Sequence, residues 1–332
     1  QQRPANDWQG FAANLKEVVK LSRAEAELRA QANGCSRYDA LLDLYEPGMT
    51  AAKLDSTFGE LKQWLPSLLA RIVEKQSHQP VAVPVGPFAV ESQQLLGNAL
   101  MKLLNFDFNA GRLDVSAHPF CGGVPEDVRI TTRYNANEFI SAMMGVIHET
   151  GHACYEQNLP KQWAGQPVAL ARSTAIHESQ SLFFEKQLGR STEFLSLLLP
   201  QVKTLMGDRP ELEEANFIAL NQRVKPGLIR VDADEVSYPA HIILRYEIER
   251  ALIESEIEVD DIPTLWQEKM QALLGLDTTG NYRDGCMQDI HWTDGSFGYF
   301  PTYTLGAMYA AQLFNSVKKA LPQVHSDIRE GN

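Results

Sequence analysis

The chain has 332 residues, of which 44% are apolar and 22% charged, so it can build a sizeable core and its composition excludes a disordered protein. Its formal net charge of −12 argues against a nucleic-acid partner, because phosphate binding requires clustered Lys and Arg. No apolar run could span a bilayer, the first residues lack the pattern of a signal peptide, and the four cysteines are widely spaced without a C-x-x-C pair. We therefore expect a cytoplasmic protein with no membrane partner.

Helical spacing of apolar residues dominates the first hundred residues. It predicts a helix over 6–32, a short helical piece over 38–45, a long amphipathic helix that Thr50 caps, and a further helix over 90–104. A connector over 79–88 with three prolines precedes the last of these. We interpret the first helix as scaffold.

Strand patterns follow the fourth helix. Residues 111–116 and the tripeptide His118-Pro119-Phe120 are extended in character, Gly122-Gly123 predicts a turn, and residues 127–134 alternate apolar and polar side chains. Together they predict one small antiparallel sheet directly before the next helix. The edge of such a sheet can pair with the backbone of an extended peptide or can be purely structural, and these residues favour neither.

The pentapeptide His148-Glu149-Thr150-Gly151-His152 lies in a helix predicted over 135–158, with Asn135 and Glu138 as a capping box. Two histidines four residues apart share one face of a helix, so they can bind one metal ion. Glu149 lies beside such an ion without binding it, where a base can take a proton from water. The motif predicts a zinc hydrolase, although a solvated pair of surface histidines has the same spacing.

A catalytic zinc ion usually takes three protein ligands, and the residues after His152 lack the third histidine of the metzincin pattern. Glu178 comes 26 residues later, early in the next predicted helix, and a gap of that length lets a second helix return against the first. It then completes a set of two His and one Glu; its alternative role is a surface charge that offsets the helix dipole. His177 is the alternative ligand, because adjacent helical residues point about 100° apart and only one can face the metal.

The rest of the chain is helical in pattern. Helices are predicted over 172–188, 192–206, 210–224, 237–259, 262–274 and 303–321, and there is no internal repeat. The predicted fold class is therefore mainly α, with one small antiparallel sheet beside the active-site helix.

Six motifs in order give the chain a resemblance to the carboxypeptidase Taq family, thermostable metallocarboxypeptidases with an HEXXH site. They are H-P-F at 118–120, D-x-R-x-T at 127–131, HETGH at 148–152, H-E-S-Q at 177–180, I-R-x-x-A-D at 229–234 and G-x-x-Q-D-x-H-W at 285–292. The resemblance implies a helical gluzincin-type peptidase fold. Members of the family are longer at both ends, so we expect a fragment of one largely helical catalytic domain that fills residues 1–332, with its active-site core over about 111–305.

The resemblance also implies removal of single amino acids from peptides with a free C-terminus. One divalent metal ion would be held by His148, His152 and Glu178, with Glu149 as the general base. Zn²⁺ is the expected metal and Co²⁺ a second candidate, since the motif does not select between divalent ions. Family members tend to dimerise, so a homodimer is expected.

Binding a terminal carboxylate calls for an arginine, whose planar fork can hold both oxygens. Arg230 occupies the family's position for this role, and a structural ion pair with Asp232 or Asp234 is the alternative. Arg129, in the predicted sheet, is a second basic candidate for substrate binding. By resemblance, Tyr303 is the residue that helps to stabilise the oxyanion, although an aromatic residue in a loop with glycine and proline often serves packing.

His118 and His291 are expected near the substrate cleft, with roles that the sequence does not separate. Two rival functions stay open. An oligopeptidase-like zinc endopeptidase shares the HEXXH helix and the downstream Glu. An inactive metal-binding, peptide-binding protein would share the metal ligands, but it would have no need of Glu149.

Overall fold

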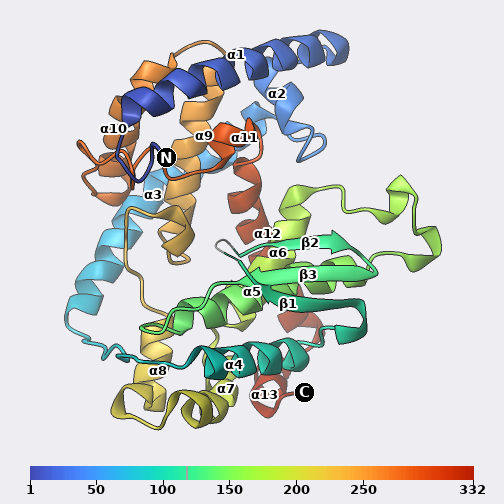
Figure 1. Ribbon diagram of the computed structural model, residues 1–332, viewed down its shortest axis with the longest axis vertical. Helices are drawn as coiled ribbons and strands as arrows, with labels where there is room; N and C mark the ends of the chain where they lie inside the picture. Colours follow the sequence, from blue (N-terminus) through green and yellow to red (C-terminus); the bar gives the residue numbers. More distant parts are fainter. Residues whose placement is uncertain (117–118) are drawn as a thin grey trace. The chain divides into compact units, whose positions relative to one another are not determined.

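The computed structural model describes residues 1–116 and 119–332, and tertiary contacts divide them into two compact units. The first unit comprises residues 1–79, 172–174 and 224–304, and the second comprises 80–171, 175–223 and 305–332. The described residues are mainly helical with one small sheet, which confirms the predicted fold class (Figure 1). The single peptidase domain, with its core over about 111–305, stays a prediction.

The first unit is organised around α9 (Tyr238–Ile253), whose apolar side chains are buried on several sides. A helix that is apolar nearly all round has to be covered by others, and α9 packs against four neighbours. These are α1 (Trp8–Asn33), α2 (Arg37–Leu42), α3 (Ala51–Ser77) and α10 (Ile262–Leu274). Thr50 caps α3 as predicted, since its hydroxyl accepts from the Lys53 amide at 3.4 Å. The short α11 (His291–Asp294) packs against α1.

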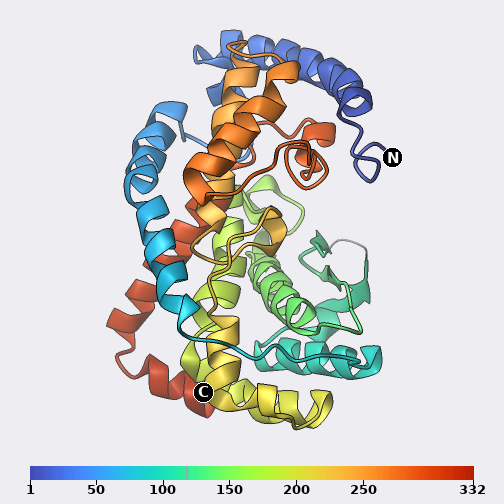
Figure 2. The ribbon, with the colours of Figure 1, turned by 90° about the vertical axis from the view of Figure 1, so that its left-hand side faces the viewer.

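The second unit is organised around α5 (Ile140–Gln157), the helix that carries the two predicted metal-binding histidines. It packs against α4 (Val90–Leu103), two strands of the sheet, and a π-helical turn over Phe183–Leu188 (Figures 1 and 2). Its buried face joins one apolar core with strand, α4 and α7 side chains. The other helices are α6 (Thr174–Leu182), α7 (Thr192–Met206), α8 (Glu214–Asn221), α12 (Pro301–Ala320) and α13 (Val324–Glu330). α6 and α12 each begin in the first unit and continue in the second.

The sheet is mixed, so the prediction of an antiparallel sheet was wrong in part. Its strands are β1 (Gly111–Val115), β2 (Cys121–Val124) and β3 (Asp127–Thr132), in the order β1-β3-β2. β2 and β3 form an antiparallel hairpin, but β3 lies between the other two strands and runs parallel to β1. Strand patterns locate extended segments, whereas the choice of partner depends on contacts between distant residues. The predicted Gly122-Gly123 turn is also wrong, because both glycines pair within the hairpin.

The start of α5 differs from the prediction. Asn135 does not cap the helix, because its side chain accepts from the Asn137 amide in a local turn. The helix begins at Ile140, where the Glu138 carboxylate accepts from the amides of Ile140 at 2.5 Å and Ser141 at 3.1 Å. A carboxylate at this end also offsets the helix dipole, so Glu138 alone serves the purpose of the predicted capping box.

Short turns connect the long elements. The helix predicted over 237–259 ends at Ile253, because Ser255 adopts a left-handed conformation with φ of 64°. α5 and α6 are joined by a largely exposed segment over 158–173 that contains two 3₁₀ turns. The 3₁₀ turns are Phe108–Ala110, Lys161–Trp163, Pro167–Ala169, Pro210–Leu212, Arg230–Asp232 and Val259–Asp261.

Candidate metal centre

His148, His152 and Glu178 come together in the second unit. The two histidines lie one turn apart on α5 with ring centroids 5.0 Å apart, and Glu178 reaches them from α6, 3.2 Å from His152 Nε2. One ligand atom of each residue lies within 4.8 Å of the other two. Glu178 is buried and both histidines are partly buried, so this group is not the solvated surface pair that the spacing alone allowed.

Two glycines make room for Glu178. A Cβ on Gly151 would lie 2.6 Å from the Gln180 carbonyl oxygen and 2.7 Å from Ser181 Cα, so only a glycine lets α6 approach α5 so closely. A Cβ on Gly306, in α12, would lie 2.8 Å from both Cβ and Cγ of Glu178. The position of the carboxylate therefore depends on small residues in two neighbouring helices.

Glu185 is a residue of this site that was not predicted from the sequence. Its Oε2 lies 3.0 Å from His148 Nδ1, and its Oε1 lies 2.7 Å from Lys186 Nζ and 3.3 Å from Arg190 Nη2. A carboxylate on one ring nitrogen fixes the orientation of an imidazole and leaves the other nitrogen to bind a metal. The available signal was its spacing, seven residues or about two helical turns beyond Glu178, which brings both side chains to similar faces.

His177, the alternative ligand, lies behind His152. Its Nδ1 is 2.6 Å from His152 Nδ1, and its Nε2 is 2.7 Å from Glu156 Oε1. Its ring also packs edge-on against Tyr155, with centroids 5.0 Å apart. Both ring nitrogens of His177 thus have protein partners, and the group of three candidate ligands does not include it.

Burial and neighbouring carboxylates shift the pKa values of the histidine pair and of Glu149. Burial alone would lower the pKa of His148, but the hydrogen bond to Glu185 and the charges of Glu178 and Glu149 raise it to about 9. Burial lowers the pKa of His152 to about 4. Burial also raises the pKa of Glu149 to about 7, with a further contribution from the negative charge of Glu178.

These residues fit a divalent cation. Glu149 is buried, and no described residue donates to its Oε2. A buried carboxylate oxygen without a donor is costly unless a cation or a water molecule faces it. Two imidazoles and one carboxylate are the donor set that hydrolytic zinc sites use, and the carboxylates of Glu178 and Glu185 already face the histidine pair.

Arg230 lies in the first unit and is buried. The alternative role predicted for Arg230 was a structural ion pair with Asp232 or Asp234, and the partner in that prediction was wrong. Arg230 Nε donates instead to Asp289 Oδ1 at 2.9 Å. The Arg230 amide donates to Gln288 Oε1 at 2.7 Å, so two residues of the G-x-x-Q-D-x-H-W motif hold it. The side chain of Asp234 instead accepts from the amides of Val236 and Ser237.

Tyr303 and His291 belong to the same group as Arg230. The Tyr303 hydroxyl lies 3.0 Å from His291 Nε2, and the guanidinium of Arg230 lies 4.9 Å from the centre of the tyrosine ring. Burial, and then the charge of Arg230, lower the pKa of His291 to about 3, so the imidazole is neutral. The guanidinium of Arg230 thus lies against an aromatic ring and a buried carboxylate, and both contacts restrict its orientation.

Arg129, one of the predicted substrate-binding residues, is not joined to either group. Arg129 is exposed on β3 and pairs with Asp127, two residues away, at 2.7 Å. His118 lies outside the described residues. The strand after it is anchored to the sheet, since the Thr131 amide donates to the Phe120 carbonyl at 2.9 Å.

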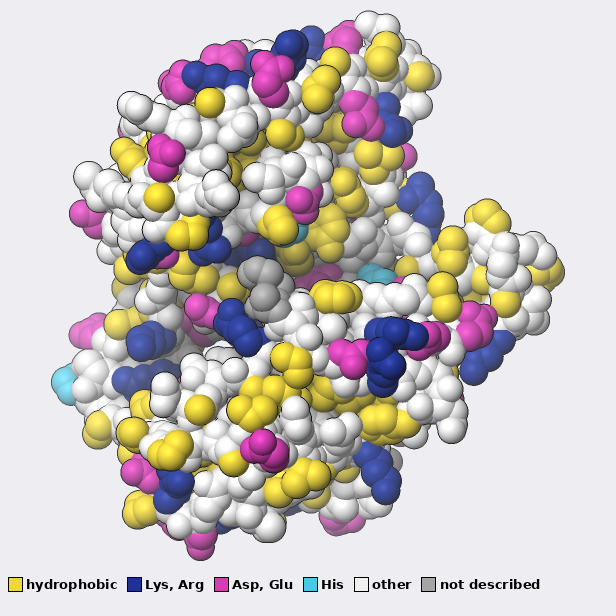
Figure 3. All heavy atoms as spheres, in the orientation of Figure 1, with side chains coloured by type: hydrophobic (Ala, Val, Ile, Leu, Met, Phe, Trp, Pro, Cys, Tyr) yellow, Lys and Arg dark blue, Asp and Glu magenta, His cyan; other side chains and the backbone are white. Residues whose placement is uncertain are grey.

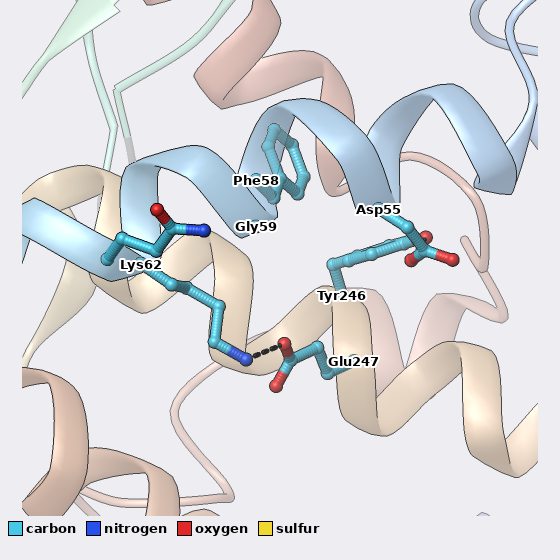
Figure 4. A pocket seen from close by; sticks show the side chains of 7 residues that line it. Asp55, Phe58, Gly59, Lys62, Tyr246 and Glu247 are labelled. Atoms are coloured by element: carbon cyan, nitrogen blue, oxygen red, sulfur yellow. Dashed lines mark hydrogen bonds and ion pairs between the residues drawn. The ribbon is translucent and has the colours of Figure 1, made fainter.

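A hollow of about 420 Å³ lies between α3 and α9 in the first unit (Figure 4). Its charged side chains already have partners. Lys62 pairs with Glu247, and Asp55 accepts from the Tyr246 hydroxyl at 2.8 Å. None of the predicted site residues lines it.

On the face drawn in Figure 3, Lys and Arg side chains are interspersed with Asp and Glu. Among the described residues, no helix is both long enough and apolar enough to cross a membrane. The four cysteines are free.

Comparison with known proteins gives one consistent family. The family model described as carboxypeptidase Taq (M32) metallopeptidase matches residues 1–332. The chain is 43% identical over 327 residues to thermostable carboxypeptidase 1 of Thermus thermophilus and 41% identical over 299 residues to carboxypeptidase 1 of Bacillus subtilis. These alignments cover 96% and 89% of this chain but only 64% and 59% of the relatives, so the chain spans about three fifths of their length.

Solved structures agree in fold. Metallocarboxypeptidase 1 of Trypanosoma cruzi superposes with a TM-score of 0.96 at 52% identity, over 99% of this chain and 67% of that one. An M32 carboxypeptidase from Deinococcus radiodurans gives a TM-score of 0.92 at 30% identity, over 100% of this chain and 67% of that one.

Proposed function

This chain belongs to the carboxypeptidase Taq (M32) family of metallopeptidases, and from that premise we propose that it carries the hydrolytic centre of a metal-dependent carboxypeptidase. The proposed reaction releases single amino acids from the free C-terminus of peptides. The observation that carries the proposal is the convergence of His148, His152 and Glu178 beside Glu149, a buried carboxylate with an unpartnered oxygen.

His148, His152 and Glu178 would hold the metal ion, with Zn²⁺ as the first candidate and Co²⁺ as the second. The Nδ1 atoms of both histidines are engaged by Glu185 and His177, which leaves the Nε2 atoms for the ion. Bound there, a divalent ion would supply Lewis acidity toward water and the scissile carbonyl.

Glu149 would act as the general base. Its neighbours on α5 are the two histidines, and its buried carboxylate has one oxygen without a protein donor, so it lies where a base can accept a proton from water beside the ion. It would take a proton from the attacking water and deliver it to the leaving amine.

Arg230 would bind the terminal carboxylate of the substrate. Asp289 and the ring of Tyr303 restrict its guanidinium, and a restricted planar fork suits the recognition of two oxygens. Tyr303 as a helper of the oxyanion, and His118, His291 and Arg129 as substrate-binding residues, stay predictions of the same kind.

A homodimer in the cytoplasm also stays part of the proposal. The proposed partners are peptides with a free C-terminus, with neither nucleic acid nor membrane among them.

The decisive test compares one peptide with a free and with an amidated C-terminus, using zinc-loaded protein. We expect sequential release of residues from the free peptide, no cleavage of the amide, and loss of turnover in Glu149→Gln with full zinc content. Glu193→Gln, which changes a carboxylate beside His325 elsewhere in the second unit, is the matched control and should keep wild-type turnover.

Internal cleavage of the amidated peptide would support the endopeptidase alternative. Zinc-loaded protein that hydrolyses neither peptide would support the inactive peptide-binding protein.

A further inference from the structure

The two candidate histidine ligands are held in different ways at Nδ1. His148 faces the carboxylate of Glu185 directly at 3.0 Å. His152 faces another imidazole, His177, at 2.6 Å, and only beyond that ring comes a carboxylate, Glu156, at 2.7 Å. Glu156 lies on α5 one turn after His152, and His177 enters between them from α6.

The chemistry of imidazole fixes the direction of the hydrogen bonds in this row. When Nε2 of His152 binds a metal ion, the single ring proton must be on Nδ1, so Nδ1 can only donate. His177 Nδ1 must then accept, which requires a neutral ring with its proton on Nε2. That proton points at Glu156, an acceptor that matches it.

We propose that His177 and Glu156 form a relay that positions His152 for metal binding, with Glu156 setting the tautomer of His177 and His177 setting the tautomer of His152. This role differs from that of a ligand and from that of Glu185, which acts on the other histidine without an intermediate. The inference rests on the proposed function only in taking His152 Nε2 as a metal-binding atom. The ring of Tyr155 packs edge-on against His177, with centroids 5.0 Å apart, and so limits the movement of the imidazole.

The test measures zinc affinity on the purified chain by competition with a chromophoric chelator, which needs no catalytic activity. Removal of a group that orients a metal-binding histidine typically weakens affinity by about 10- to 100-fold. We expect losses in that range for His177→Phe and for Glu156→Leu. Glu156→Gln should stay within about threefold of wild type, because the amide oxygen can still accept from His177 Nε2.

A double variant distinguishes a relay from two separate contacts. Because Glu156 acts only through His177, Glu156→Leu should have no further effect on affinity in a His177→Phe background. Glu193→Leu, which removes the carboxylate beside His325, is the matched control and should leave affinity unchanged. Thermal unfolding of the metal-free variants shows whether each one folds.

Selective ¹⁵N-histidine labelling gives a second readout that a purely structural role would not affect. In the zinc-loaded protein, His177 should be a neutral ring with its proton on Nε2. A proton on Nδ1 of His177, unchanged zinc affinity in His177→Phe, or additive losses in the double variant would each overturn the relay. Absence of zinc binding by the wild-type chain would instead contradict the proposed function.

Discussion

Asp289 is the residue that fixes Arg230, and both side chains are almost fully buried. Removing the charge of one partner leaves the other uncompensated in a poorly solvated place. We expect Asp289→Asn to lower the free energy of unfolding by about 3 kcal/mol. It should also raise KM for a free-carboxylate peptide more than it lowers kcat, because Arg230 loses its orientation. Denaturant unfolding and steady-state kinetics measure the two effects.

Asp284→Asn is the control for that change. Asp284 pairs with Arg283 at 2.7 Å near the surface of the same segment, where an ion pair contributes about 1 kcal/mol or less. If both variants lose the same free energy of unfolding, the buried pair contributes no more to stability than the surface pair.

His241 makes the stability of the first unit depend on pH. It is 1% exposed on α9, and burial together with the charge of Arg230 lowers its pKa to about 4. The unfolded chain binds a proton at pKa about 6.5, so between these values the unfolded state binds more protons and stability falls as pH falls. Between pH 7 and pH 4, protonation of His241 should lower the free energy of unfolding by on the order of 3 kcal/mol.

The measurement is the free energy of unfolding of wild type and His241→Phe across that range. The variant should lose less stability on acidification than wild type. Its stability should still fall somewhat with pH, because the pKa of His291 is also lowered, to about 3. His78→Phe changes an exposed histidine and should follow wild type. Parallel curves for all three proteins would contradict the assignment.

The packing of α12 on α6 sets the position of Glu178. Gly306→Ala would place a Cβ 2.8 Å from the inner carbons of the Glu178 side chain, which cannot move aside without moving the carboxylate. We expect zinc affinity to fall by about tenfold or more. The overpacked contact should also cost about 1–3 kcal/mol in the free energy of unfolding.

Gly59→Ala is the opposite case in the same chain. Gly59 lies inside α3, and a Cβ added there would meet no atom within 4 Å, so alanine should stabilise the helix by about 0.5–1 kcal/mol without a change in zinc affinity. Chelator competition and thermal unfolding on both variants separate close packing from helix propensity. Equal behaviour of the two would show that α12 does not constrain Glu178.

The elements that could be predicted are those specified by their own residues. Helices over 192–206 and 262–274 agree with α7 and α10, because both have amphipathic spacing and α7 has its Ser191 cap. The order of the three strands could not be predicted, since the parallel pairing of β1 with β3 joins residues that are not neighbours in sequence. The start of α5 was missed because Asn135 forms a local turn.

The same distinction applies to the candidate site. The HETGH spacing predicted two histidines on one face, and the structure brings Glu178 to them. Glu185 was missed because its contact with His148 depends on how the π-helical turn packs on α5. Asp289 was missed because two nearer acids, Asp232 and Asp234, were more obvious partners for Arg230 than one 59 residues away.

The residues with predicted functions are divided between the two units. The candidate metal ligands, Glu149 and Glu185 lie in the second unit, whereas Arg230, His291 and Tyr303 lie in the first. A ligand stabilises what it binds, by about 4 kcal/mol at a thousand times its dissociation constant. Saturation with zinc should therefore slow hydrogen exchange in α5 and α6 much more than in α9 and α10.

Hydrogen exchange followed by mass spectrometry, with and without zinc, makes this comparison. Glu178→Gln, which weakens the metal site, serves as the control and should remove the difference. Equal slowing in α9 and α10 would show that the metal stabilises both units as one.

The largely exposed segment over 158–173 connects the two helices that supply the candidate ligands, but it supplies none of them. The ligand geometry is set by the contact of Gly151 with α6, not by the length of this connection. Doubling the length of a flexible loop costs only about 0.6 kcal/mol of closure entropy. The exposed stretch over 161–168 is therefore a natural insertion point, where a reporter domain could be placed while α5 and α6 keep their contact.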